Sequence, residues 1–190
     1  MDFSHYSDTA VQMAVDLVNT VDRASGDDQL TDVDGLLAFL DRYASEWDRD
    51  DFDPKAIAPI HVERVRRLRT RLRAVLEADT AEEAADGLNR ILIDVQATPR
   101  VSLHSEHPHM HFEPKKRGVA KWLGAATAMG IATVLVDQGI ERFGTCASTT
   151  CVDSFIDTSR NRSRLHCSTT CANREHVAAH RRRAVAVSEN

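Results

Sequence analysis

Four cysteines near the end of the chain are the residues best suited to chemistry, and the sequence contains no others. They form two short-spaced pairs, Cys146-x4-Cys151 and Cys167-x3-Cys171, with 15 residues between the pairs. If those residues fold back on themselves, four thiolates meet around one ion. Four thiolates complete a tetrahedral zinc site and leave no open position for a substrate. The pattern therefore predicts a structural metal centre that holds Zn²⁺.

From the sequence alone, two alternatives to zinc binding stay open for these thiols, namely disulfide bonds and an iron–sulfur cluster. Disulfide bonds are disfavoured because a reducing cytosol keeps thiols free. An iron–sulfur cluster uses the same four ligands and would make the protein a redox sensor. Ligand type and spacing favour zinc over both alternatives.

The segment around the cysteines is basic, although the formal net charge of the chain is −5 at pH 7. Residues 1–59 hold 14 acidic and 4 basic residues, whereas residues 157–183 hold 7 arginines and two acids. An acidic body with a basic end indicates that the end, and not the body, meets a polyanion.

The candidate nucleic-acid-binding residues all lie in or just after the cysteine segment. They are Arg160, Arg162, Arg164, Asn173, Arg174, Arg181, Arg182 and Arg183. Guanidinium groups and the N–H groups of a helix N-terminus both suit phosphates, so we expect backbone contacts to outweigh base readout.

The rest of the chain predicts a mostly helical body that must position this module. Apolar residues recur at helical spacing in four segments between residues 7 and 97. The period changes to two on either side of residues 105–108, which predicts a β-hairpin. The segment "WLGAATAMGIATVLV" has 15 residues, fewer than the ~20 that a membrane span needs, and predicts a buried helix.

The C-terminal module is expected to contain a cysteine knuckle, a β-hairpin and a helix. "VDSFIDTS" would form one strand, "RNRS" a turn, and "RLHC" the return to the metal. "ANREHVAAHRRRAVAV" would continue as a helix whose first turn carries Cys171. The predicted fold class is mainly α (α+β), with a helical domain over residues 1–138 and the four-cysteine module over residues 139–190.

The C-terminal stretch resembles the CGNR zinc finger, a module of bacterial regulators. The matching segments are "CASTTC", "FIDTSR", "RSRLHC" and "CANR". Two residues depart from the family pattern. Ala172 replaces the glycine that gives the family its name, and His166 replaces the aromatic residue that commonly precedes the third cysteine. Ala is a better helix former than Gly, so we expect the helix to persist.

Near the start, "AVDLVNTVD" is similar to the N-terminal signature of the ABATE domain, which commonly precedes this zinc finger in stress-induced transcription regulators. The resemblance implies a homodimeric DNA-binding regulator whose N-terminal domain senses a small-molecule effector or dimerises. Asn19 and Thr20 of this signature are candidate ligand-binding residues, and they could equally form hydrogen bonds inside the fold.

No catalytic triad, phosphate-binding loop or clearly placed carboxylate pair occurs, so we expect no enzymatic activity. The first residues lack the pattern of a secretion signal, so we expect a cytoplasmic protein without a membrane partner. The favoured function is transcription regulation through the zinc module. The alternatives are a protein- or RNA-binding adaptor that uses the same module and an iron–sulfur redox sensor.

Overall fold

The computed structural model describes residues 4–47, 51–102 and 109–188. Helices α1 (Ser4–Val18), α2 (Val33–Asp41), α3 (Pro59–Leu76) and α4 (Ala81–Val95) come first, with a short 3-10 helix η1 (Pro54–Ala56) before α3. Strands β1 (Ala97–Ser102) and β2 (His109–Pro114) precede the long helix α5 (Val119–Gln138). The chain ends with η2 (Ile140–Arg142), β3 (Phe143–Thr145), β4 (Ser154–Ile156) and α6 (Thr169–Ser188). The mainly α fold class with short hairpins is confirmed.

Local signals in the sequence explain where several helices begin and end. The Asp32 side chain accepts a hydrogen bond from the backbone N–H of Gly35 and so caps α2. Thr80 caps α4 in the same way by accepting from the N–H of Glu83. Gly118 and Gly139 flank α5 with positive φ angles of 143° and 89°, which are accessible to glycine at little cost.

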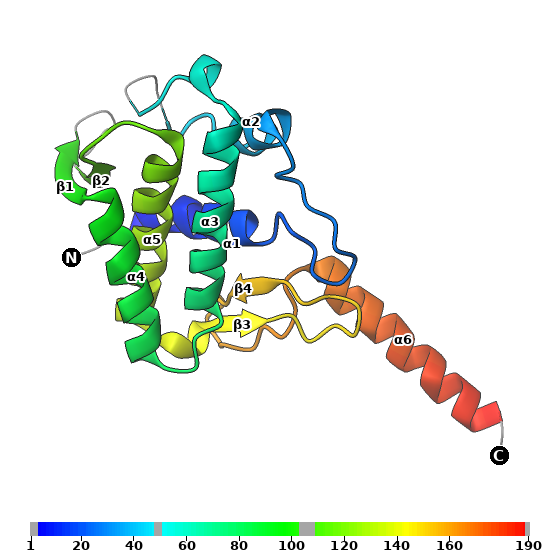
Figure 1. The fold of residues 1–190 in the computed structure, drawn as a ribbon. Helices are drawn as coiled ribbons and strands as arrows, with labels where there is room; N and C mark the ends of the chain where they lie inside the picture. The colour runs from blue at the N-terminus through cyan, green and yellow to red at the C-terminus, as the bar shows by residue number, and fades with distance from the viewer. Residues whose placement is uncertain (1–3, 48–50, 103–108, 189–190) are drawn as a thin grey trace.

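Helix α5 lies at the centre of the body, between α1 and α4 (Figure 1). Its length and hydropathy would suit a membrane span, yet most of its apolar window is buried inside the molecule. The prediction of a buried helix is therefore confirmed. Its glycines permit close packing, because a Cβ at Gly130 would lie 2.9 Å from the carbonyl carbon of Ala10.

The two-residue period correctly predicted the first hairpin. Strands β1 and β2 pair antiparallel, with Ala97 opposite Pro114 and Ser102 opposite His109. This hairpin lies at the opposite end of the body from β3 and β4 (Figure 1).

The second hairpin uses a different partner strand from the one the sequence suggested. Strand β4 pairs antiparallel with β3, which precedes Cys146, and not with the segment leading to Cys167. The returning segment bonds the knuckle through its backbone, since the N–H of Ala147 donates to the carbonyl of Leu165 (2.9 Å). Strand β4 is buried along its whole length because it packs against the body, and Ile156 joins the main core.

Most arginines of α3 are neutralised by acidic neighbours in the body. Arg69 is buried and makes two hydrogen bonds to Asp28, at 2.6 and 2.8 Å. Arg66 approaches the same carboxylate, and Arg67 pairs with Glu63. The arginines of α3 therefore leave less positive charge free for a polyanion than their number suggests.

Adding a methyl group at the two tightest glycines of α5 should have unequal effects on stability. At Gly130 the new Cβ meets helix backbone, whereas at Gly124 it meets the Cγ1 of Val95 (2.8 Å), which can rotate. Gly130→Ala should lower the free energy of unfolding by about 1–3 kcal/mol because α1 must move. Gly124→Ala should lower the free energy of unfolding by less than about 1 kcal/mol, because the better helix propensity of Ala offsets part of the cost.

Urea denaturation of the two variants and the wild type measures this difference. Equal losses, or a Gly130→Ala protein more stable than the wild type, would contradict the close packing of α5 on α1.

Candidate metal centre and its basic surface

Three short pieces of backbone bring the four cysteines together. Cys146 follows β3 and Cys151 precedes β4, so the β3–β4 hairpin fixes both ends of the first knuckle. Cys167 lies just before α6, and Cys171 lies in the first turn of that helix. Cys146 and Cys171 are buried, while Cys151 and Cys167 are partly exposed.

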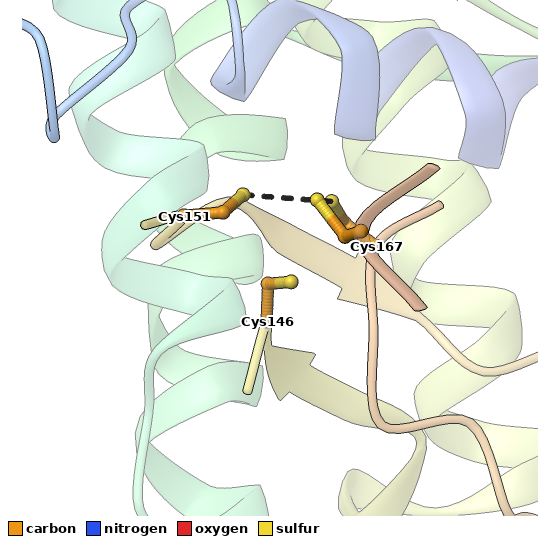
Figure 2. Close-up of side chains that lie close together, drawn as sticks. Cys146, Cys151 and Cys167 are labelled. Carbon is orange, nitrogen blue, oxygen red and sulfur yellow. Dashed lines mark hydrogen bonds between the residues drawn. The ribbon is translucent and has the colours of Figure 1, made fainter. Parts of the chain in front are cut away.

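The spacing of the sulfur atoms suits one tetrahedral ion. All four Sγ atoms lie within 4.8 Å of one another. Cys167 Sγ lies 3.6 Å from Cys151 Sγ and 3.7 Å from Cys171 Sγ, and Figure 2 shows Cys151 and Cys167 pointing toward each other. A tetrahedron with Zn–S bonds of about 2.3 Å has edges of about 3.8 Å.

The two other fates of the thiols fit this arrangement less well. All four cysteines are free, not joined as disulfides. An iron–sulfur cluster distributes its thiolates over more than one iron and needs wider separations than these. The donor set therefore fits a single zinc ion.

Side chains from α6 hold the first knuckle in place. The Glu175 carboxylate accepts hydrogen bonds from the hydroxyl of Ser148 (2.9 Å) and from the N–H and hydroxyl of Thr149 (2.9 and 3.0 Å). Arg174 donates to the hydroxyl of Thr150 at 2.7 Å. Contacts between α6 and the first knuckle thus already link the two cysteine pairs, and a bound zinc ion would add a second link.

Asp157 organises the loop that carries the first arginines. One of its buried carboxylate oxygens accepts from the N–H of Ser159 (2.8 Å), and the other accepts from the N–H of Arg164 (2.9 Å). Burial raises the pKa of Asp157, but these hydrogen bonds and the charge of Arg142 outweigh that effect and hold the pKa below its usual value. The carboxylate therefore stays ionised and closes the loop between Ser159 and Arg164.

The predicted basic residues fall into two groups according to their contacts. Arg164 donates to the carbonyls of His166 and Cys167 and stacks over the Phe155 ring at 5.3 Å, so it supports the third ligand. Arg162 has a φ of 49° and bonds the exposed Glu141 at 2.5 Å.

The remaining predicted contact residues either have exposed side chains or have side chains outside the described part of the chain. Arg160, Asn173 and Arg181 are solvent-exposed. The backbone at Arg182 and Arg183 is helical, but their side chains lie outside the described part of the chain. Arg160, Arg162 and Arg164 therefore lie on one loop, and the other predicted residues lie along α6.

Asn19 and Thr20 occupy different environments. Thr20 is buried, and its hydroxyl donates to the Leu17 carbonyl (2.7 Å) and accepts from Arg69 (3.0 Å). Asn19 lines a cleft of about 900 Å³ between α1 and the cysteine module. Its amide nevertheless bonds the backbone of Ser154.

Sequence reasoning missed the two carboxylates of the basic segment. Asp157 and Glu175 are the only acids among residues 157–183. Both accept hydrogen bonds that fix a loop. The available signal in the sequence was that these two acids stand alone in an arginine-rich stretch. A carboxylate in such a stretch is expected to have a structural partner nearby.

The two departures from the family pattern are accommodated locally. Ala172 lies inside α6 and its N–H bonds the Ser168 carbonyl at 3.1 Å, so the helix persists as expected. The Nδ1 of His166 lies 3.9 Å from Cys146 Sγ, a long contact that suits a weak hydrogen bond to sulfur.

Gathering the thiols changes their acidity in opposite directions. Burial raises the pKa of Cys151 to about 12, and burial together with the neighbouring thiols raises that of Cys167 still further. Burial also acts on Cys146, but hydrogen bonds from the N–H groups of Cys167 and Ser148 and from His166 lower its pKa to about 6. Without a cation, Cys151 and Cys167 are therefore protonated at neutral pH.

Zinc affinity should consequently rise steeply with pH. Binding must displace the protons of Cys151 and Cys167, and each proton released makes the affinity about tenfold tighter per pH unit. Between pH 7 and pH 8 the association constant should increase by about a hundredfold or more. Competition with a chromophoric chelator, corrected for the protonation of the chelator, measures it. An affinity independent of pH would show that these thiols are not the ligands.

Comparison with known families agrees with this geometry. The ABATE family, described as "Putative stress-induced transcription regulator", matches residues 12–138. The CGNR zinc finger family matches residues 142–184, which include all four cysteines. A search of curated proteins finds no match. The family and the sulfur geometry together confirm the expected zinc site. The chain therefore belongs to the ABATE family and carries a CGNR zinc finger at residues 142–184.

Proposed function

We propose that this regulator binds DNA, with the zinc module contacting the phosphate backbone. The family match supports a regulator rather than an enzyme. The observation that carries the proposal is helix α6, which leaves the body and projects as a lone helix (Figure 1). A projecting basic helix next to a basic loop can follow the backbone of a duplex.

The charges of this surface support contact with a polyanion. Arg160 and Arg181 are exposed, and neither has an ion pair or hydrogen bond to a described residue. The arginines of α3 differ, since Arg66, Arg67 and Arg69 are paired with carboxylates of the body. The zinc module thus carries exposed arginines that have no carboxylate partner among the described residues.

Each predicted contact residue has its own role in this proposal. Arg160, Arg181, Arg182 and Arg183 bind phosphates directly. Arg162 exchanges its exposed partner Glu141 for a phosphate, which costs little because exposed ion pairs are weak. Arg164 and Arg174 act mainly by shaping the metal loops, and Asn173 at the exposed start of α6 is the candidate for a base contact.

The helical body supplies regulation in this proposal. We place the boundary between the two domains after residue 138, where α5 ends. An effector would occupy the cleft of about 900 Å³, whose walls come from α1, including Asp8 and Gln12, and from the zinc module, including Thr150 and Arg174. Homodimerisation and a cytoplasmic location stay predictions.

Salt dependence of binding tests the phosphate contacts directly. Replacing Arg160, Arg181, Arg182 and Arg183 with Gln should weaken binding to duplex DNA. If all four contact phosphates, the slope of log K against log salt should flatten by about 3.6. Fluorescence anisotropy with a labelled duplex between low and moderate salt measures both quantities.

Arg64→Gln with Arg67→Gln is a control that removes two exposed positive charges from α3 and leaves the zinc module unchanged. The control should leave the slope within about one unit of the wild type. Equal slopes for wild type and the four-residue variant would refute the DNA interface. Tighter binding of single-stranded RNA than of duplex DNA at the same salt would favour the adaptor function.

A further inference from the structure

Asn19, in the turn that ends α1, makes a two-point contact with the zinc module. Its Nδ2 donates to the Ser154 carbonyl at 2.8 Å, and its Oδ1 accepts from the Ser154 N–H at 3.0 Å. The N–H and the carbonyl of one strand residue point to the same side of the strand. The amide of Asn19 therefore makes the hydrogen bonds that a neighbouring strand would make on the edge of β4 that does not face β3.

This contact lies close to the metal ligands in the chain. Ser154 follows Cys151 by three positions and opposes Thr145, the residue before Cys146. In addition, the N–H of Cys146 donates to the carbonyl of Asp153 at 2.8 Å. A shift of Ser154 would thus move the backbone that carries Cys146 and Cys151.

The surroundings make the contact costly to lose. Ser154 is fully buried and Asn19 is partly buried. Without the Asn19 amide, the backbone N–H and carbonyl of Ser154 would lose their hydrogen bonds at a fully buried residue, and unpaired buried groups are penalised.

We infer that Asn19 is a positioning residue for the zinc centre and couples zinc binding to the stability of the helical body. The inference concerns zinc and folding, so it does not depend on DNA binding. It also gives a physical reason for the asparagine in the "LVNT" segment: the residue docks the body onto the module. By linkage, the coupling is reciprocal, so zinc stabilises the body as much as the docked body favours zinc.

Zinc affinity of the full chain is the first test. Asn19→Ala should weaken zinc binding by roughly tenfold or more, because it leaves two backbone groups unpaired in the bound state. Asn19→Asp preserves the size of the side chain but removes the donor, and it should also weaken binding.

Two control variants separate this effect from general damage. Gln12→Ala removes an amide of the same helix that donates a hydrogen bond to Asp16 within α1, so zinc affinity should not change. Ser154→Ala removes a buried hydroxyl that has no hydrogen-bond partner among the described residues and keeps the backbone contact to Asn19. It should therefore leave zinc affinity within about twofold of the wild type.

Thermal melts followed by tryptophan fluorescence are the second test. Both tryptophans of the chain, Trp47 and Trp122, pack in the helical body, so their fluorescence reports its unfolding. Adding a zinc chelator should lower the melting temperature of the wild-type body. The chelator should cause a clearly smaller shift in Asn19→Ala, because the remaining link runs through β4 and Arg142.

The outcomes decide between coupling and a local structural role. If Asn19 only ends α1, Asn19→Ala will lower the melting temperature equally with and without chelator and leave zinc affinity unchanged. That result overturns the inference. Should Asn19→Ala fail to fold, the isosteric Asn19→Asp decides, and wild-type zinc affinity in that variant overturns the inference equally.

Discussion

Mutual repulsion of four clustered thiolates is the constraint on which the C-terminal half of the molecule depends. Their sulfur atoms lie within 4.8 Å of one another, a distance at which several negative charges cannot persist without a cation. A divalent ion removes the repulsion and joins the β3–β4 hairpin to the start of α6. The position of α6 relative to the body follows from that junction.

The zinc module has almost no hydrophobic core of its own. Instead, it packs against the core of the helical body. Ile156 of β4 belongs to the main core, and Arg142 donates to the carbonyls of Asp157 (2.8 Å) and Ser159 (2.6 Å). A conventional small zinc finger folds on its metal alone. Here the metal, the packing of β4 on the body and the Asn19 contact together hold the module in place. A change in the body can therefore reach the basic loop through short, buried connections.

Periodicity and ligand spacing made much of this structure predictable. Helical spacing identified α1 to α4, the long apolar segment identified α5, and the spacing of the cysteines identified the ligand set. The partner of β4 was not predictable in the same way, because β3 has only three residues and carries no alternating pattern. Likewise, Asn19 bonds a residue 135 positions away, and such a contact depends on tertiary packing that no local pattern encodes.

X-ray absorption at the zinc edge of the purified full chain tests the central claim most directly. The account predicts one zinc per chain with four sulfur neighbours at about 2.3 Å and no lighter ligand. Nitrogen or oxygen in the coordination shell, or a protein that folds fully with less than stoichiometric metal, would contradict it.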